Sequence, residues 1–573
     1  MKVVAIDIET SGMTFDAQVL AIGVAWSAGP DAPITTQSRV LSHGDLFTPL
    51  STIPETRAWL LRIIADARWL IFHNACFDLP YLLRLGLLTS DELKGRVFDT
   101  LVMAATSGAH ASLALTALCP EFGVPVPASW ARMKGMRGKL ASSSMSEVAD
   151  YCEEDCGATL AVYYKLLPEV AGIYDDAWIA REGDYCALLA RMRVRGIQLD
   201  LAFVQAKQTE CRTRVALLLQ EILIPAGIPS ANTHDKVWAW VKRADLTPNW
   251  TSSTSLDAET LQAIRAKAVQ DAQPSHTIAV LDAVLECRKL SKIDSTYLTG
   301  YLAHADPVGV IHANFFNGGT RTWRLSSNQP DTQNVPRDLQ GELFTASQPG
   351  GALLALDYSQ AQLRLAAMYA KEHEMARLFA LTGTDIHTAT AIALFGAEEG
   401  PRRRREGKGA NFAVLFGSGA AGVASNYHLD IEIANQVLAE HRQAFPRLQA
   451  GSREASRRWA TRGYLILPYG KRTYARYDDL AHRSFVAWNY LIQGAEGTIM
   501  EHAMLELERQ GFPPLVNQVH DSLYFDVPPD LDPDQVGRDA AAVLAAAVPA
   551  DLCSRTDPPI TMPTEAKIKR RLR

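Results

Sequence analysis

Roughly the first 170 residues alternate between short apolar runs and stretches in which apolar side chains recur at helical spacing. Such runs are typical of buried strands, whereas the helical spacing indicates amphipathic helices. Ser144 and Glu147 have the spacing of a capping box that begins a helix. We therefore expect an α/β domain with a mixed or largely parallel sheet covered by helices. The expected strands are 3–6, 19–26 and 69–72, and the expected helices are 78–87 and 147–166.

The pattern changes twice along the rest of the chain. From about residue 175 to about 300, strongly amphipathic stretches predict a mainly helical region, which a polar insert at 226–256 interrupts. Beyond about residue 305, strands and helices are mixed, so the whole chain is expected to be multidomain, of α/β and α+β class. The landmarks of this last region are an apolar strand at 352–356, a basic helix at 402–416 and a hairpin-like segment at 514–527.

Composition narrows the function classes only slightly. The chain has 573 residues, and a hydrophobic fraction of 47% is enough for sizeable cores, which excludes wholesale disorder. Its 57 Lys and Arg residues against 63 Asp and Glu residues give a net charge of −6. The net charge therefore does not point to nucleic acid, and a site for a polyanion has to come from local basic clusters.

The cysteines and the apolar runs exclude several other classes. Eight cysteines are scattered without a C-x-x-C pair, which argues against a disulfide framework or a zinc ribbon and is typical of a reducing, cytoplasmic setting. The N-terminal apolar run is too short for a signal peptide, and no run of 18 apolar residues occurs. We therefore expect a cytoplasmic protein with no membrane partner.

Four acidic residues of the first block are candidates for a metal site. Asp7 and Glu9 stand two residues apart after an apolar strand, so their carboxylates share one side of the chain. Asp78 follows the strand at 69–72, and Asp155 lies on a predicted helix, four residues after Tyr151 and on the same face. Carboxylates that crowd together need cations, and hard oxygen ligands favour Mg²⁺ or Mn²⁺. Taken singly, each acid is better explained as an ordinary surface or capping residue, and only the four together favour a metal site.

A second pair of acids lies in the last block, with a basic helix between them. Asp357 ends the apolar strand, and Asp521 stands between two alternating apolar runs where a hairpin would turn. Acids at a strand end and at a hairpin turn can meet across adjacent strands and hold two metal ions. Arg404, Lys408 and Phe412 recur at helical spacing, a stripe that suits a triphosphate and a base or sugar. The alternative is a solvated basic face.

The first set of acids resembles a known enzyme family. Asp7-Ile-Glu9, Asn74-x-x-x-Asp78 and Tyr151-x-x-x-Asp155 are similar to the three motifs of the DEDD 3′→5′ exonucleases, in the tyrosine subclass. The resemblance implies a ribonuclease H-like domain that cuts the 3′ end of single-stranded DNA. It also implies that all four acids hold two metal ions and that the tyrosine positions the attacking water.

The second set resembles family A DNA polymerases of the polymerase I type. The string DYSQAQLR (357–364), Arg404 with Lys408 and Phe416, and Val519-His520-Asp521 are similar to motifs A, B and C of that family. The resemblance extends from residue 1 to about 530 and implies a right-hand fold after the exonuclease. The domains expected from it are an exonuclease at 1–172, a thumb at 173–304, a palm at 305–366 and 511–573, and fingers with connecting helices at 367–510.

The resemblance also implies a role for each site residue. Two Mg²⁺ ions, or Mn²⁺ in their place, are expected at each active site. At the polymerase site, Asp357 and Asp521 are implied to hold them. Lys408 is implied as a phosphate contact and as the proton donor to the departing pyrophosphate. The residues implied to contact the dNTP are Arg404, His387, Phe412, Phe416, Gln362 and Tyr358. The residues implied to contact primer–template DNA, largely through the minor groove, are Arg324, Asn489, Gln493 and His520.

The chain departs from the family pattern at several of these positions. Where this chain has Gln362 and Phe416, members of the family usually have Glu and Tyr. In those proteins the Glu carboxylate accepts a hydrogen bond from the Tyr hydroxyl. The two changes agree with each other, because a partly buried carboxylate without that donor would be costly. We expect Gln362 still to exclude a ribose 2′-OH by bulk. Compared with the usual family pattern, this chain has Ser522 in place of an acidic residue, Trp323 in place of Gly and Phe485 in place of Arg.

The interpretation is a DNA-directed DNA polymerase that acts in DNA replication and carries a proofreading exonuclease on the same chain. We expect a monomer, with any processivity partner unidentified, and the insert at 226–256 as a variable thumb tip or a partner site. We expect no 5′-nuclease domain beside this compact pair of domains, which resembles bacteriophage replicative polymerases, with a bacterial origin as the alternative. Two rival functions are a single-subunit RNA polymerase and a non-catalytic DNA-binding subunit built on a decayed polymerase.

Overall fold

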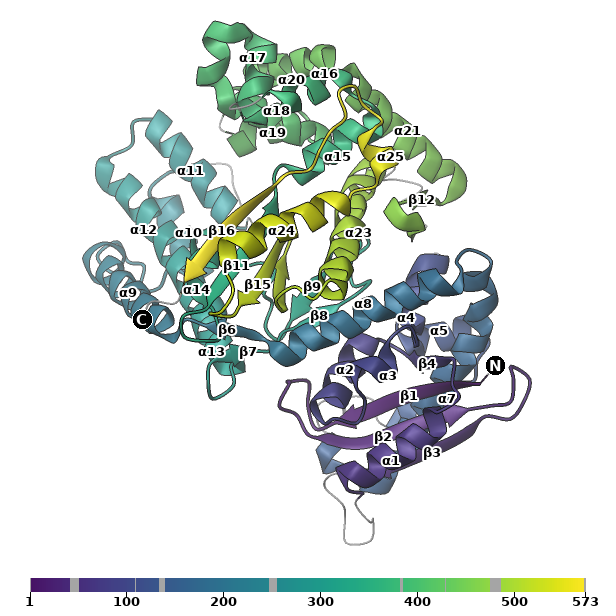
Figure 1. The fold of residues 1–573 in the computed structure, drawn as a ribbon. Helices are drawn as coiled ribbons and strands as arrows, with labels where there is room; N and C mark the ends of the chain where they lie inside the picture. Colours follow the sequence, from purple (N-terminus) through teal and green to yellow (C-terminus); the bar gives the residue numbers. More distant parts are fainter. Residues whose placement is uncertain are drawn as a thin grey trace. The chain divides into compact units, whose positions relative to one another are not determined.

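The computed structural model describes residues 2–41, 51–108, 110–132, 140–246, 255–381, 385–427, 429–474 and 486–570 (Figure 1). The chain divides into two compact units. The first comprises Met1–Gly196, His312–Asn334 and Ala346–Arg573, and the second comprises Ile197–Ile311 and Val335–Thr345. This division is coarser than the predicted domains, whose boundaries stay predictions. Among the described residues, no helix is both long enough and apolar enough to cross a membrane.

A five-stranded mixed sheet in the order β3-β2-β1-β4-β5 forms the N-terminal part of the first unit. The central strand β1 runs antiparallel to β2 and parallel to β4, so the sheet is mixed, one of the two arrangements that the sequence pattern predicts. The strands are β1 Val3–Thr10, β2 Val19–Trp26, β3 Thr35–Val40, β4 Trp69–Phe72 and β5 Val97–Asp99. The helices are α1 Ile53–Ile64, α2 Ala75–Arg84, α3 Ser90–Leu93, α4 Thr100–Ser107, α5 Leu115–Glu121, α6 Ala128–Arg132 and α7 Met145–Ala171.

The long helix α7 packs across β1, β2 and β3. The predicted capping box is present at its start, where the Ser144 hydroxyl accepts from the backbone N–H of Glu147 and the Glu147 carboxylate accepts from that of Ser144. Both interactions satisfy amide groups that have no partner inside the helix. The cap sets where α7 begins, and so which of its residues face the sheet.

Helix α8, Asp176–Arg195, belongs to the first unit, although the predicted thumb begins at residue 173. It packs against α2 and β5 on one side and against α23 on the other. Arg191 and Glu508 form an ion pair between α8 and α23 at 2.8 Å from the arginine Nε. The buried ammonium of Lys471 lies 2.7 Å from a carboxylate oxygen of Glu182 on α8 and also pairs with Glu501 on α23.

A four-stranded antiparallel sheet in the order β14-β15-β11-β16 forms the C-terminal part of the same unit. Strand β11 covers the predicted apolar strand, and β14 with β15 forms the predicted hairpin. The elements here are β8 Asn314–Phe316, β9 Ser326–Asn328, β11 Ala352–Tyr358, β14 Leu515–Val519, β15 Ser522–Val527, β16 Thr564–Arg570, α15 Ala361–Ala370, α23 Ala487–Arg509, α24 Pro533–Ala546 and α25 Ala550–Cys553.

A helical region between α15 and α23 includes the predicted basic helix as α18. Gly407 lets α18 approach α17 closely, because a Cβ there would lie 2.4 Å from the carbonyl oxygen of His387. The elements are α16 His373–Ala380, α17 Ile386–Glu399, a 3₁₀ turn at Gly400–Arg403, α18 Arg404–Phe416, α19 Ala420–Tyr427, α20 Ile431–Ala444, α21 Pro446–Arg462, β12 Tyr464–Ile466 and β13 Arg472–Tyr474.

The second unit is mainly helical, as the amphipathic pattern predicts. The stretch expected to be a polar insert is in fact partly an amphipathic helix, α10, which buries Trp238 and Trp240 in a core of its own; residues 247–254 lie outside the described chain. The elements are β6 Ile197–Leu199, α9 Leu201–Leu218, a π-helical turn at Leu219–Leu223, α10 His234–Arg243, α11 Ala258–Gln270, α12 Ser275–Lys292, a π-helical turn at Ile293–Thr299, α13 Gly300–His304, β7 Val310–Ile311, α14 Arg337–Leu343 and β10 Phe344–Thr345.

Candidate active sites

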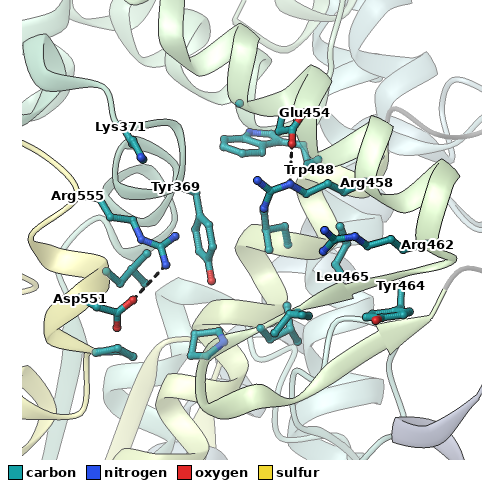
Figure 2. Close-up of a pocket in the computed structure, with 18 of the residues that line it drawn as sticks. Tyr369, Lys371, Glu454, Arg458, Arg462, Tyr464, Leu465, Trp488, Asp551 and Arg555 are labelled. Atoms are coloured by element: carbon teal, nitrogen blue, oxygen red, sulfur yellow. Dashed lines mark hydrogen bonds and ion pairs between the residues drawn. The ribbon is translucent and has the colours of Figure 1, made fainter. Parts of the chain in front are cut away.

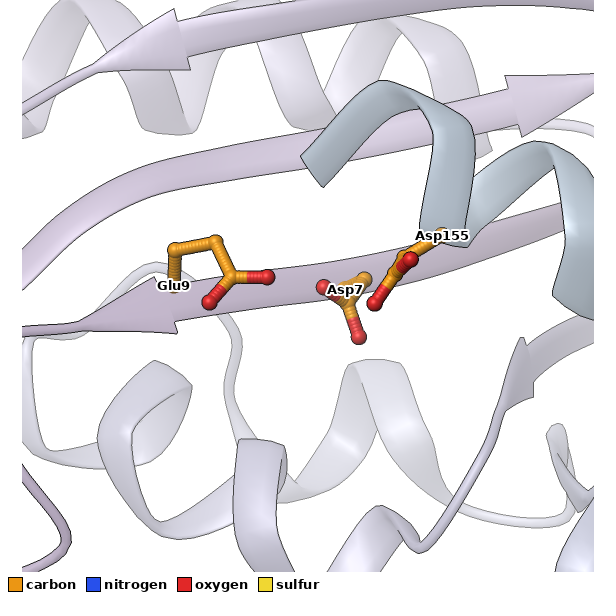
Figure 3. Close-up of side chains that lie close together, drawn as sticks. All are labelled: Asp7, Glu9 and Asp155. Atoms are coloured by element: carbon orange, nitrogen blue, oxygen red, sulfur yellow. The ribbon is translucent and has the colours of Figure 1, made fainter. Parts of the chain in front are cut away.

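Strand β1 and helix α7 bring three of the four N-terminal acids together. Asp7 and Glu9 lie two residues apart on β1, and Asp155 reaches them from α7 (Figure 3). One carboxylate oxygen of each of the three lies within 4.8 Å of the others. The indole N–H of Trp130 donates to Asp155 and helps to hold that carboxylate in place. Three oxygen donors at this spacing can share a divalent cation.

The fourth acid, Asp78, lies beside this group and faces the strand. It is 2% exposed on α2 and accepts a hydrogen bond of 3.2 Å from the backbone N–H of Ile8. Its charge is near enough to help raise the pKa of Asp7. Tyr151, the predicted partner of the attacking water, lies one turn before Asp155 on α7. The structure thus brings the four predicted acids near one another, with Asp78 tied to the backbone, and the role of Tyr151 stays a prediction.

The N-terminal acid group is electrostatically costly without a cation. Burial, followed by the charges of Asp78 and Glu9, raises the pKa of Asp7 well above its usual range. Burial also raises the pKa of Asp78, against the hydrogen bond from Ile8. A divalent cation would remove the repulsion between these carboxylates and restore their ionised forms. The donor set consists only of hard oxygen atoms, which fits Mg²⁺ or Mn²⁺.

The second pair of acids meets at the end of the C-terminal sheet. Asp357 lies opposite Ser522 in the β11–β15 register, and the backbone N–H of Tyr358 donates to the carbonyl oxygen of Asp521 at 3.3 Å. His520, with a φ of 54°, and Asp521 make the two-residue turn between β14 and β15. The sequence pattern therefore predicts correctly that an acid at a strand end meets one at a hairpin turn.

Burial and neighbouring charges raise the pKa values of these two aspartates. The pKa of Asp357 is raised to about 6 by burial and by its proximity to Asp521, and the pKa of Asp521 is raised to about 6 by burial and by the charge of Glu496. The Oδ1 atom of Asp357 is buried and has no hydrogen-bond partner among the described residues. A buried oxygen without a donor, beside a second carboxylate, fits a site for a hard divalent cation.

Glu496 is a residue of this site that the sequence motifs do not identify. Its carboxylate is 2% exposed, forms an ion pair with Arg324 and lies 3.4 Å from the side-chain amide nitrogen of Gln362. It follows Asn489 and Gln493 at helical spacing on α23, so all three share a face. That spacing is the signal that could have identified it.

One residue expected to border the nucleotide faces the other way. Successive side chains of a strand point to opposite faces, so Tyr358 points away from the side on which Asp357 lies. The Tyr358 side chain is buried, and its hydroxyl donates to the carbonyl oxygen of Leu544 in α24. The Tyr358 side chain is therefore directed away from the site, so the predicted contact of this residue with the dNTP would have to come from its backbone.

The basic stripe forms on α18 as predicted, with His387 of α17 beside it. Arg404 pairs with Asp385 at 3.1 Å, and the Lys408 ammonium lies 5.9 Å from the ring centroid of Phe412. His387 is 3% exposed and its Nδ1 lies 3.2 Å from the Asn411 amide nitrogen. Burial lowers its pKa to about 4, so it is neutral at pH 7. Phe416 ends α18, and its side chain lies outside the described part of the chain.

A cavity of about 400 Å³ lies on another face of α23, away from both acid groups. Trp488 and Leu491 of α23 line it, together with residues of α15, α21, β12 and α25. Figure 2 shows Tyr369 between Arg458 and Arg555, whose guanidinium groups pair with Glu454 and Asp551. None of the predicted site residues lines this cavity.

Comparisons with known proteins agree with this geometry. The model of DNA polymerase family A matches residues 236–552, and that of a 3'-5' exonuclease matches residues 1–171. A thermostable DNA polymerase I of Thermus filiformis is 32% identical over 364 residues, which are 60% of this chain and 43% of the relative. DNA polymerase I of Chloroflexus aurantiacus is 29% identical over 489 residues, 80% of this chain and 50% of the relative. The chain thus spans about half the length of these curated relatives.

A solved structure shares the fold. The POL domain of Pol1 from M. smegmatis, in complex with DNA primer-template and dNTP, superposes with a TM-score of 0.75 at 20% identity. The alignment covers 99% of this chain and 95% of that one. The predicted order, an exonuclease domain followed by a polymerase domain, is confirmed. These relatives are bacterial, and the phage-like origin stays a prediction. The chain belongs to the family A DNA polymerases and carries a 3'-5' exonuclease domain at its N-terminus.

Proposed function

We propose that this protein copies a DNA template from dNTPs at one site and removes 3′-terminal nucleotides at another. The observation that carries the proposal is the proximity of Asp357, near the end of β11, to Asp521, in the turn between β14 and β15, in a chain of the polymerase family. The separate group of Asp7, Glu9 and Asp155 supports the second activity. All of these carboxylates are retained, which disfavours a non-catalytic subunit on a decayed polymerase.

At the polymerase site, Asp357 and Asp521 would hold two divalent ions, Mg²⁺ in the first place. When bound, such ions lower the pKa of the primer 3′-OH and offset the charge that develops on the transferred phosphate. Lys408 and Arg404 project from one stripe of α18 and suit the phosphates of an incoming dNTP. Phe412, beside them, suits the deoxyribose.

The DNA itself would be held from α23 and the neighbouring segments. Asn489 and Gln493 present amide groups on the α23 face that carries Glu496, and Arg324 lies against that face. Amides and guanidinium groups can donate to the minor-groove acceptors that nearly all base pairs share, which suits an enzyme that copies any sequence. His520, in the turn beside Asp521, would contribute to the same primer–template contacts.

At the exonuclease site, Asp7, Glu9 and Asp155 would hold the ions, with Asp78 beside them. Tyr151, one turn before Asp155, would orient the attacking water. The substrate is the single-stranded 3′ end of DNA, so that a mispaired primer end released from the polymerase site can be removed. Proofreading is therefore the proposed role of this domain.

One gel tests both activities. A 5′-labelled primer on a longer template is incubated with Mg²⁺, with and without dNTPs, and extension and shortening are read in the same lanes. Asp357→Asn with Asp521→Asn is expected to abolish extension but not shortening, and extension by this variant at the wild-type rate would contradict the assignment. Replacing dNTPs with NTPs distinguishes a DNA polymerase from an RNA polymerase.

A further inference from the structure

We propose that Glu496 is a specificity-determining residue of the polymerase site, one that positions both Arg324 and Gln362. The inference rests on the proposed polymerase activity and goes beyond it, because neither the motifs nor the family resemblance identifies this residue. It supplies from α23 a carboxylate that the family motif places at position 362.

Among the described residues, the side-chain hydrogen bonds of Glu496 are with two predicted site residues. Arg324 donates to its Oε2 from Nε at 2.9 Å and from Nη2, and the Gln362 amide nitrogen lies 3.4 Å from both carboxylate oxygens. The carboxylate is 2% exposed. The Glu496 carboxylate thus accepts hydrogen bonds from Arg324, which is predicted to contact DNA, and from Gln362, which is predicted to select the sugar.

The backbone is shaped to allow this approach. A Cβ at Gly497 would lie 2.6 Å from the carbonyl oxygen of Trp323, so a glycine next to Glu496 lets α23 lie directly against the Arg324 segment. Trp323 itself has a φ of 55°, a region that favours the glycine usual in the family. Its indole N–H donates to the Arg472 carbonyl oxygen at 3.0 Å, which holds this strained residue in place.

A stabilising role alone is a poor explanation of the Glu496 contacts. A buried ion pair contributes little net stability, because desolvation of both charges offsets their attraction. Here the desolvated carboxylate also faces the like charges of Asp357 and Asp521, which makes the position more costly still. What the pair provides is geometry, because a guanidinium and an amide that both donate to one buried acceptor are confined to few orientations.

The residues at 362 and 496 are chemically complementary. A Glu at 362 would place a second carboxylate about 3.4 Å from that of Glu496, whereas the Gln present donates to it. With its NH₂ group donating to Glu496, Gln362 is restricted to few side-chain orientations. A rigid side chain excludes a ribose 2′-OH, whereas a mobile one can move aside. Glu496 therefore sets sugar selection through Gln362 and holds Arg324 for the primer.

The test is a swap of the two residues. In Glu496→Gln, Gln362 and Arg324 lose their common acceptor, so incorporation of ribonucleotides relative to deoxynucleotides, as the ratio of kcat/KM values, is expected to rise about tenfold. The single change Gln362→Glu, which opposes two carboxylates, is expected to reduce dNTP incorporation by a similar factor. The double variant Gln362→Glu with Glu496→Gln restores one acid and one amide and should return both values to within about threefold of wild type.

Two controls separate positioning from folding. Glu501→Gln removes another buried carboxyl of α23, one that pairs with Lys471, and is expected to leave the sugar ratio unchanged. The rate at which each variant shortens single-stranded DNA at the exonuclease site serves as the control for folding, because both sites lie on the same chain. An unchanged ratio in Glu496→Gln, or a double variant whose defect is the product of the two single ones, overturns the inference while the polymerase assignment stands. Absence of extension by the wild-type protein overturns both.

Discussion

Asp357 lies directly opposite Ser522 in the antiparallel pair of β11 and β15, so its neighbour across the turn is Asp521. Because side chains alternate along a strand, a slip of one residue in this register would turn Asp357 to the opposite face of the sheet. The register is held by six successive pairs, from Ala352 opposite Val527 to Asp357 opposite Ser522. The proximity of Asp357 to Asp521 is thus a property of the sheet.

Asp357→Asn is expected to stabilise the metal-free protein while it abolishes synthesis. The folded-state pKa of Asp357, about 6, lies above its usual value, so the free energy of unfolding falls as pH rises from about 4 to 6. The Asn side chain cannot ionise, so the variant avoids the cost of a buried charge beside Asp521. In EDTA, the Tm of the variant should therefore exceed that of wild type at pH 8 but not at pH 4. Thermal unfolding at both pH values, with primer extension in parallel, checks this. An unchanged Tm at pH 8 would contradict the proposed repulsion.

The Mg²⁺ requirement of synthesis is expected to rise steeply below pH about 6. Asp357 and Asp521 both have pKa values of about 6 without metal, so protons and Mg²⁺ compete for the same oxygens below that pH. The Mg²⁺ concentration that gives half-maximal extension should therefore increase from pH 7 to pH 5.5, while the rate at saturating Mg²⁺ changes less. The measurement is a Mg²⁺ titration of primer extension at each pH. A requirement independent of pH would show that these carboxylates do not bind the ion.

Trp130→Phe is expected to weaken the exonuclease selectively. The Trp130 indole N–H donates to Asp155, and Phe keeps the ring but has no donor. Loss of one charge-assisted hydrogen bond to a ligand carboxylate should slow degradation of single-stranded DNA by about tenfold. Primer extension should stay at the wild-type rate. The matched control is Asp7→Ala with Glu9→Ala, which removes two of the three clustered carboxylates and should abolish degradation altogether.

Local pattern was enough to predict several elements of the fold, including the helix that carries Asp155. The apolar run at 19–26 is a strand with those bounds, and the Ser144–Glu147 capping box begins α7. The turn at Asp521 also follows from alternating apolar runs on either side. Each of these features depends on residues close together in sequence, where periodicity and capping rules apply directly.

Features that depend on distant contacts could not be predicted in this way. Glu496 belongs to the site only because α23 packs against the segment of Arg324, 172 residues earlier in the chain. The orientation of Tyr358, next to Asp357 on a strand, follows from alternation, but the partner of its buried hydroxyl, Leu544 of α24, depends on packing 186 residues away in the chain. Trp238 lies in a stretch whose composition is polar. The apolar face of α10 is recognised only from the core against which this helix packs.

The buried group of Lys471, Glu182 and Glu501 predicts a pH-dependent effect of Glu501→Gln. Two carboxylates share one ammonium here, and burial with the charge of Glu182 raises the pKa of Glu501 to about 8. The folded state therefore holds a proton between pH 4.5 and about 8 that the unfolded state has lost, so wild-type stability decreases as pH rises through that window.

Gln at position 501 mimics the protonated acid at every pH. The Tm of Glu501→Gln should match that of wild type at pH 5 and exceed it by several degrees at pH 9, as differential scanning fluorimetry would show. Lys471→Met is the matched control, because it leaves the two acids facing each other without a cation and should lower the Tm at both pH values. If Glu501→Gln is instead less stable than wild type at pH 9, Glu501 is charged in the fold, and the ammonium neutralises both carboxylates.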